Sequence, residues 1–62
     1  MKNKVNEMRK RLGWSQDMLS QVSGVPASTI SEIENGKRTP GVDIALMLAR
    51  AMGVSVEDLF YI

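Results

Sequence analysis

The sequence predicts an all-α fold of five short helices. Apolar residues recur three or four positions apart in several short stretches, which is the spacing of helices that bury one face. Glycines and prolines separate these stretches, and no segment alternates apolar and polar residues as a half-buried strand does. Residues 1–62 allow one domain with a small core, so helix packing or association with another chain must stabilise it.

The first helix is expected over residues 3–12 and is ended by Gly13. Its apolar face consists of three residues at helical spacing, namely Val5, Met8 and Leu12. The second helix is expected over residues 16–23, between an N-cap at Ser15 and a helix end at Gly24. Glycine readily adopts the positive φ that such an end requires.

Three further helices follow the second one. Pro26 presets the backbone of the first turn of a third helix, and Gly36 follows its end. Residues 42–52 are mostly apolar and predict a fourth, largely buried helix. Ser55 followed by Asp58 resembles a capping box, which predicts a short fifth helix.

The composition argues against several classes of function. The chain has no cysteine and no histidine, so it lacks disulfides, thiolate metal ligands and the commonest general base. We therefore expect no enzyme activity, no cofactor and no metal site. The apolar stretches are shorter than the roughly 20 residues of a membrane span, and no leader pattern is present. These observations favour a cytoplasmic protein with no membrane partner.

The run from Gln16 to Asn35 is typical of a helix-turn-helix, in which two short helices pack across a turn. Its apolar anchors are Leu19, Val25, Ile30 and Ile33. In such a motif the second helix enters the major groove of DNA. The net charge is only +1, but basic residues gather near the start of the chain and after Gly36. The pattern therefore predicts double-stranded DNA as the partner.

The third helix has two different faces. When Ile30 and Ile33 turn toward the core, about 100° per residue places Ser28, Glu32 and Asn35 on the opposite side. Side chains on that outer face and at the start of the inserted helix can reach base edges. The candidates for base contact are Pro26, Ala27, Ser28, Ser31 and Glu32. The alternative interpretation is a polar face that meets only water.

Glu34 lies on the buried half of the same helix, where a carboxylate needs a cationic or hydrogen-bonding partner. Arg9 falls close to Val5 on the apolar face of the first helix. We therefore expect Arg9 and Glu34 to form an ion pair that joins the first and third helices. Its role would be structural, because removing one partner leaves the other charge stranded.

Two segments, GWSQDMLSQVSGVPASTISEIENGKRTP and ALMLARAMGVSVEDLF, resemble the Cro and phage-repressor class of helix-turn-helix regulators, also called the XRE family. The resemblance implies a compact five-helix, lambda-repressor-like domain that binds DNA, and it supports the Arg9–Glu34 pair. It also implies a phosphate contact at Gln16. The base-side residues would be Ala27, Ser28 and Glu32, and the residues that hold the DNA backbone would be Asn35, Lys37 and Arg38.

The fourth helix is apolar around most of its circumference, which one small core cannot cover. We expect its uncovered side and the apolar chain end to form a homodimer interface, which includes Leu46, Phe60, Tyr61 and Ile62. A dimer would place two recognition helices about 34 Å apart over a roughly palindromic operator. The favoured hypothesis is a homodimeric transcriptional regulator that binds a roughly palindromic operator and represses transcription. The alternative is an antitoxin-like or adaptor protein that binds a regulatory protein partner through the same apolar surface.

Overall fold

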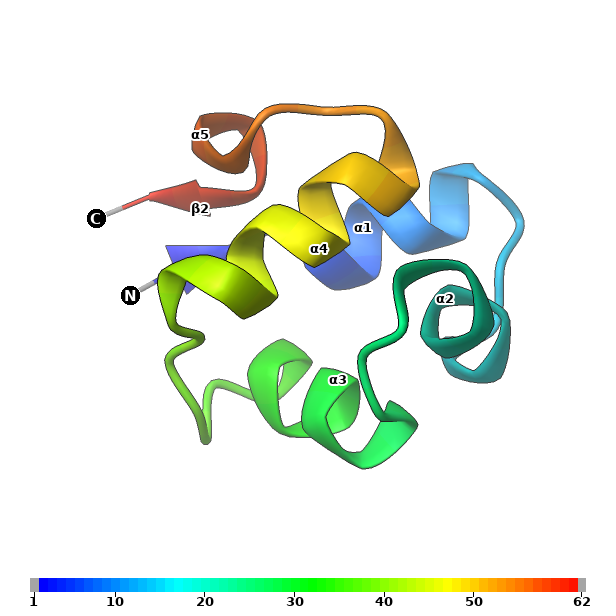
Figure 1. The fold of residues 1–62 in the computed structure, drawn as a ribbon, viewed down its shortest axis with the longest axis horizontal. Helices are drawn as coiled ribbons and strands as arrows, with labels where there is room; N and C mark the ends of the chain where they lie inside the picture. The colour runs from blue at the N-terminus through cyan, green and yellow to red at the C-terminus, as the bar shows by residue number, and fades with distance from the viewer. Residues whose placement is uncertain (1, 62) are drawn as a thin grey trace.

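The computed structural model describes residues 2–61, and within this range five helices surround one core (Figure 1). The predicted all-α class is confirmed. The helices are α1 (Val5–Arg11), α2 (Gln16–Ser23), α3 (Ala27–Glu34), α4 (Val42–Met52) and α5 (Val56–Leu59). Two short strands, β1 (Lys2–Asn3) and β2 (Phe60–Tyr61), join the two ends of the described chain.

The antiparallel pairing of β1 with β2 was not predicted, and it shortens the first helix. That helix begins at Val5 rather than at residue 3, because the Asn3 side-chain oxygen accepts the Val5 N–H at 3.2 Å. The Lys4 N–H donates to the Leu59 carbonyl at 2.8 Å, which holds the start of the chain against α5. Ile62 lies outside the described residues, so its predicted contact has no structural description.

The core takes side chains from every helix. α2 packs against both α3 and α4, and α1 packs against α3. The largest fully buried side chains are Val5, Leu19, Val25, Ile30, Ile33, Leu48 and Leu59. All four helix-turn-helix anchors predicted from the sequence belong to this set, which fixes α2 and α3 relative to each other.

The helix ends show how local sequence sets this arrangement. Ser15 caps α2, and the predicted capping box of Ser55 and Asp58 is present at α5. Gly24 ends α2 at a φ of 81°, a left-handed conformation that glycine adopts without steric strain. A Cβ at Gly24 would lie 3.4 Å from the Met47 methyl carbon, so the turn passes close to α4. The turn at Gly24 therefore ends α2 and passes close to α4.

Candidate nucleic-acid interface

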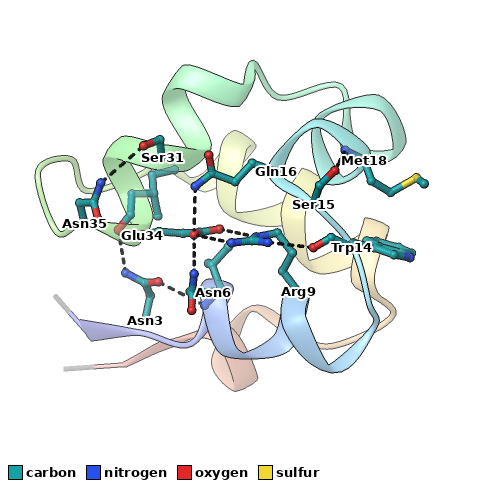
Figure 2. Close-up of polar contacts among 12 residues, drawn as sticks. Asn3, Asn6, Arg9, Trp14, Ser15, Gln16, Met18, Ser31, Glu34 and Asn35 are labelled. Carbon is teal, nitrogen blue, oxygen red and sulfur yellow. Dashed lines mark hydrogen bonds and ion pairs between the residues drawn. The ribbon is translucent and has the colours of Figure 1, made fainter.

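The end of α3 is held by a buried carboxylate, that of Glu34 (Figure 2). Arg9 Nε lies 2.9 Å from Glu34 Oε2, and Arg9 Nη2 lies 3.1 Å from Oε1. Asn6 and Gln16 also donate to Oε1, at 2.8 and 3.2 Å. The Arg9 and Glu34 side chains are only 11% and 4% exposed. We call these four residues the Glu34 network; it ties α3 to α1 and α2.

Burial and hydrogen bonding act in opposite directions on Glu34. Burial disfavours the charged form and would raise the pKa of its carboxyl group. Hydrogen bonds from Arg9, Asn6 and Gln16, together with the charge of Arg9, outweigh burial and hold that pKa below its ordinary value. The Glu34 hydrogen bond correspondingly raises the pKa of Arg9. Both groups are therefore charged at neutral pH, and Arg9 also donates to the Trp14 carbonyl at 2.8 Å.

Gln16 was predicted to contact a phosphate, and the structure gives its side chain a defined position. One N–H of its amide donates to Glu34, so the half-buried side chain is held at the start of α2 (Figure 2). A side-chain amide has two N–H donors, which leaves a second one for an external acceptor. The Glu34 network thus positions Gln16 while leaving it able to bind an anion.

The start of α3 differs from the starts of α2 and α5. Pro26 is the N-cap, with φ −56° and ψ 141°, and the helix begins at Ala27. No side chain caps this end, because proline carries no acceptor on its ring. The first N–H groups of a helix have no partner within the helix and can bind a phosphate.

The predicted base-side residues lie on the outer side of α3. Pro26, Ser28 and Glu32 are exposed, whereas Ala27 and Ser31 are half-buried. The Ser31 hydroxyl accepts a hydrogen bond from the Asn35 amide at 3.4 Å (Figure 2). Thr29, Ile30 and Ile33 are buried and form the inner side. The division of this helix into two faces therefore agrees with helical spacing.

The residues predicted to contact the DNA backbone lie directly after α3. Gly36 adopts a φ of 73°, and the Lys37 N–H donates to the Glu32 carbonyl at 2.9 Å. This turn folds the chain back over the last turn of α3 and leaves Asn35, Lys37 and Arg38 exposed. The loop cations therefore follow the predicted base-side residues closely along the chain.

A sequence model of the helix-turn-helix family matches residues 5–59 of this chain. The chain belongs to the helix-turn-helix family. The matched segment begins with α1 and ends with α5, so it includes all five helices and every core residue except Phe60.

Two similar sequences and one similar structure support this family assignment. The uncharacterized HTH-type transcriptional regulator YgzD of Bacillus subtilis is 40% identical over 62 residues, which cover all of this chain and 94% of that protein. The competence pilus inhibition repressor of Acinetobacter baylyi is 39% identical over 56 residues, covering 90% of this chain and 51% of that protein. The restriction-modification controller protein C.AhdI from Aeromonas hydrophila has a similar structure, with a TM-score of 0.87 and 32% identity over 92% of this chain and 86% of that one. This helix-turn-helix protein is a DNA-binding transcriptional regulator.

An apolar groove lies between the start of α4 and the end of the chain. Its volume is about 340 Å³, and it is lined by Pro40, Gly41, Val42, Ala45, Leu46, Val56 and Phe60. Of the predicted dimer residues, Leu46 and Tyr61 are exposed, whereas Phe60 is only 8% exposed and packs in the core. No helix within residues 2–61 is long and apolar enough to cross a bilayer.

Sequence reasoning missed two asparagines that support the site. Asn6 donates to Glu34, and Asn3 donates to the Ile33 carbonyl at 3.0 Å (Figure 2). Neither residue stands out by type or spacing, because their partners lie 28 and 30 positions away in the chain. The only signal was the buried position of Glu34, whose carboxylate accepts more hydrogen bonds than one arginine supplies.

Replacing Arg9 with alanine is expected to lower the free energy of unfolding by about 3 to 5 kcal/mol, because the buried Glu34 carboxylate loses its charged partner. Chemical denaturation followed by circular dichroism measures this change. Arg11→Ala is the matched control, since Arg11 and Glu7 form a pair at 3.6 Å that is 69% and 56% exposed. Such exposed pairs contribute about 0.2 to 1 kcal/mol. Equal losses in the two variants would contradict a structural role for Arg9.

The lowered pKa of Glu34 predicts a pH dependence of stability. Its stabilising contribution is present above the ordinary pKa of 4.5 and is lost as the pH falls through the lower pKa of the folded state. Glu34→Gln should lower stability at neutral pH and make the unfolding free energy less steeply dependent on pH in the acid range. Denaturation of both proteins over a series of pH values tests this. An unchanged pH slope in the variant would show that Glu34 does not titrate as expected.

Proposed function

We propose that this regulator binds a roughly palindromic operator as a homodimer and represses transcription by blocking access of RNA polymerase. In each subunit α3 enters the major groove. The observation that carries this proposal is the arrangement around α3, where the polar outer face is followed directly by an exposed loop with two cations. The proposal assigns a cytoplasmic role without catalysis or a cofactor.

The contacts divide into two kinds. Gln16, Asn35, Lys37 and Arg38 hold phosphates, together with the uncapped start of α3. Pro26, Ala27, Ser28, Ser31 and Glu32 lie at the base edges, where Glu32 can accept from a cytosine amino group and Ala27 can contact a thymine methyl. This set lacks the arginine, asparagine or glutamine that most often reads guanine or adenine. One subunit therefore reads few bases, and two are needed for useful specificity.

A second copy of the chain is the proposed occupant of the apolar groove. The groove is lined by residues of α4, α5 and β2, and Figure 1 shows α5 and α3 at opposite ends of the molecule. A partner seated there leaves the outer face of α3 free to meet DNA. The net charge of +1 also means that two copies repel each other only weakly. Val42, which lines this groove, is 78% exposed and is therefore available to a partner.

The same groove supports a second candidate function, that of an antitoxin-like or adaptor protein whose main partner is another protein. Apolar lining suits a protein partner as well as a second copy of this chain. DNA binding would then be secondary. Duplex binding and self-association, measured separately, distinguish the two functions.

Binding to a duplex is expected to weaken as the salt concentration rises, with each phosphate contact contributing about −0.9 to the logarithmic slope. Lys37→Gln should weaken binding to all duplexes by a similar factor, because a phosphate contact carries no sequence information. Ser28→Ala should instead change the ranking of sequences selected from a random duplex library. Fluorescence anisotropy over a salt series measures both effects. Duplex binding that is undetectable even at low salt would refute DNA binding as the main function.

Self-association is expected to depend on the groove and not on apolar exposure in general. Leu46 and Met47 are neighbours on α4 with similar exposed fractions, 38% and 37%, but only Leu46 lines the groove. Leu46→Glu should shift the protein toward monomer, because it places a charge in the interface, whereas Met47→Glu should leave the dimer intact. Sedimentation equilibrium measures the change. Monomeric wild-type protein, or an equal effect of both substitutions, would rule out this interface.

A further inference from the structure

Glu32 and Arg38 form an ion pair that joins the two kinds of contact in the proposed interface. Arg38 Nη1 lies 3.7 Å from Glu32 Oε1, and the two side chains are 52% and 50% exposed. The backbone sets up this approach, because the Lys37 N–H donates to the Glu32 carbonyl and folds the loop back over α3. A base-side carboxylate is thus the counterion of a residue that holds the DNA backbone.

The two cations of this loop therefore differ in their ionic partners before DNA binds. Arg38 has Glu32 as an ionic partner, whereas Lys37 forms no ion pair with any group in residues 2–61. The Glu32–Arg38 pair is solvent-exposed, so it is weak enough for a phosphate to displace. Once Arg38 moves to a phosphate, the Glu32 carboxylate faces the polyanionic groove without a counterion.

What happens next depends on the base that Glu32 meets. Cytosine presents an amino donor in the major groove, while guanine presents only acceptors there. Opposite cytosine the carboxylate gains a hydrogen bond that replaces Arg38. Opposite guanine the carboxylate faces lone pairs, so keeping Arg38 as its counterion is favoured.

We propose that the Glu32–Arg38 pair makes the phosphate contact of Arg38 depend on the base opposite Glu32. This proposal rests on the proposed insertion of α3 into the major groove. Lys37 then holds phosphates on any sequence, and Arg38 does so fully only where Glu32 finds an amino donor. The few base-contacting residues thereby discriminate more strongly between DNA sequences, because a mismatch loses a base contact and a backbone contact together.

The test compares Arg38→Gln with Lys37→Gln on two duplexes, the most enriched duplex from a random library and the same duplex with its bases shuffled. Lys37→Gln should weaken binding to both by a similar factor. Arg38→Gln should weaken binding to the enriched duplex and reduce its salt slope by about 0.9 per bound subunit. On the shuffled duplex Arg38→Gln should leave the salt slope nearly unchanged, because Arg38 holds no phosphate there. An equal fall of the salt slope on both duplexes for Arg38→Gln would overturn the proposal.

A double-mutant cycle tests the pair itself on the shuffled duplex. Glu32→Gln releases Arg38 and should tighten binding in the wild-type background. In the Arg38→Gln background the tightening should be smaller by about two- to five-fold, the range that the strength of exposed pairs allows. The same tightening factor in both backgrounds would show that Glu32 acts on DNA without Arg38 and would overturn the inference alone. If no variant binds either duplex, the proposed function fails as well.

Discussion

The hydrogen bonds of the Glu34 carboxylate are the interaction on which the geometry of the proposed DNA-binding surface depends. The carboxylate sits at the last residue of α3 and accepts hydrogen bonds from Asn6 and Arg9 of α1 and from Gln16 of α2. Apolar packing alone leaves short helices free to slide and rotate by small amounts, whereas a buried charge with directional donors tolerates little displacement. The network therefore specifies how α3 is presented, beyond holding the domain together.

Two glutamates of α3, only two positions apart, have different roles. Glu34 is almost fully buried and its partner Arg9 cannot leave without stranding a charge, so this pair belongs to the fold. Glu32 is half-exposed, and its partner Arg38 can exchange the carboxylate for a phosphate with little loss. The helical repeat places the Glu34 carboxylate inside the domain and the Glu32 carboxylate on its surface. Because of this difference in solvation, the buried glutamate–arginine pair is a structural link and the exposed pair is a contact that can exchange.

The apolar groove beside α4 lies among both buried and exposed apolar residues. Pairing of β1 with β2 holds Phe60 against the core, while Leu46 and Tyr61 stay exposed beside the groove. Phe60 and Tyr61 are therefore held by the strand pairing, and only Tyr61 of the two is exposed. In the proposed function this arrangement separates the surface for association from the surface for DNA.

Sequence alone was sufficient for the five helices, the helix-turn-helix anchors, the caps at Ser15 and Ser55 and the pairing of Arg9 with Glu34. The helices, anchors and caps depend on helical periodicity or on hydrogen bonds between near neighbours, which residue types and spacing report directly. The Arg9–Glu34 pair spans 25 positions, and it could be predicted because periodicity places both charges on buried helix faces. The tertiary structure decided the β1–β2 ladder, the roles of Asn3 and Asn6, the burial of Phe60 and the approach of Arg38 to Glu32. Each of these depends on how the folded chain brings separate elements or turns together in space, and no local pattern encodes that proximity.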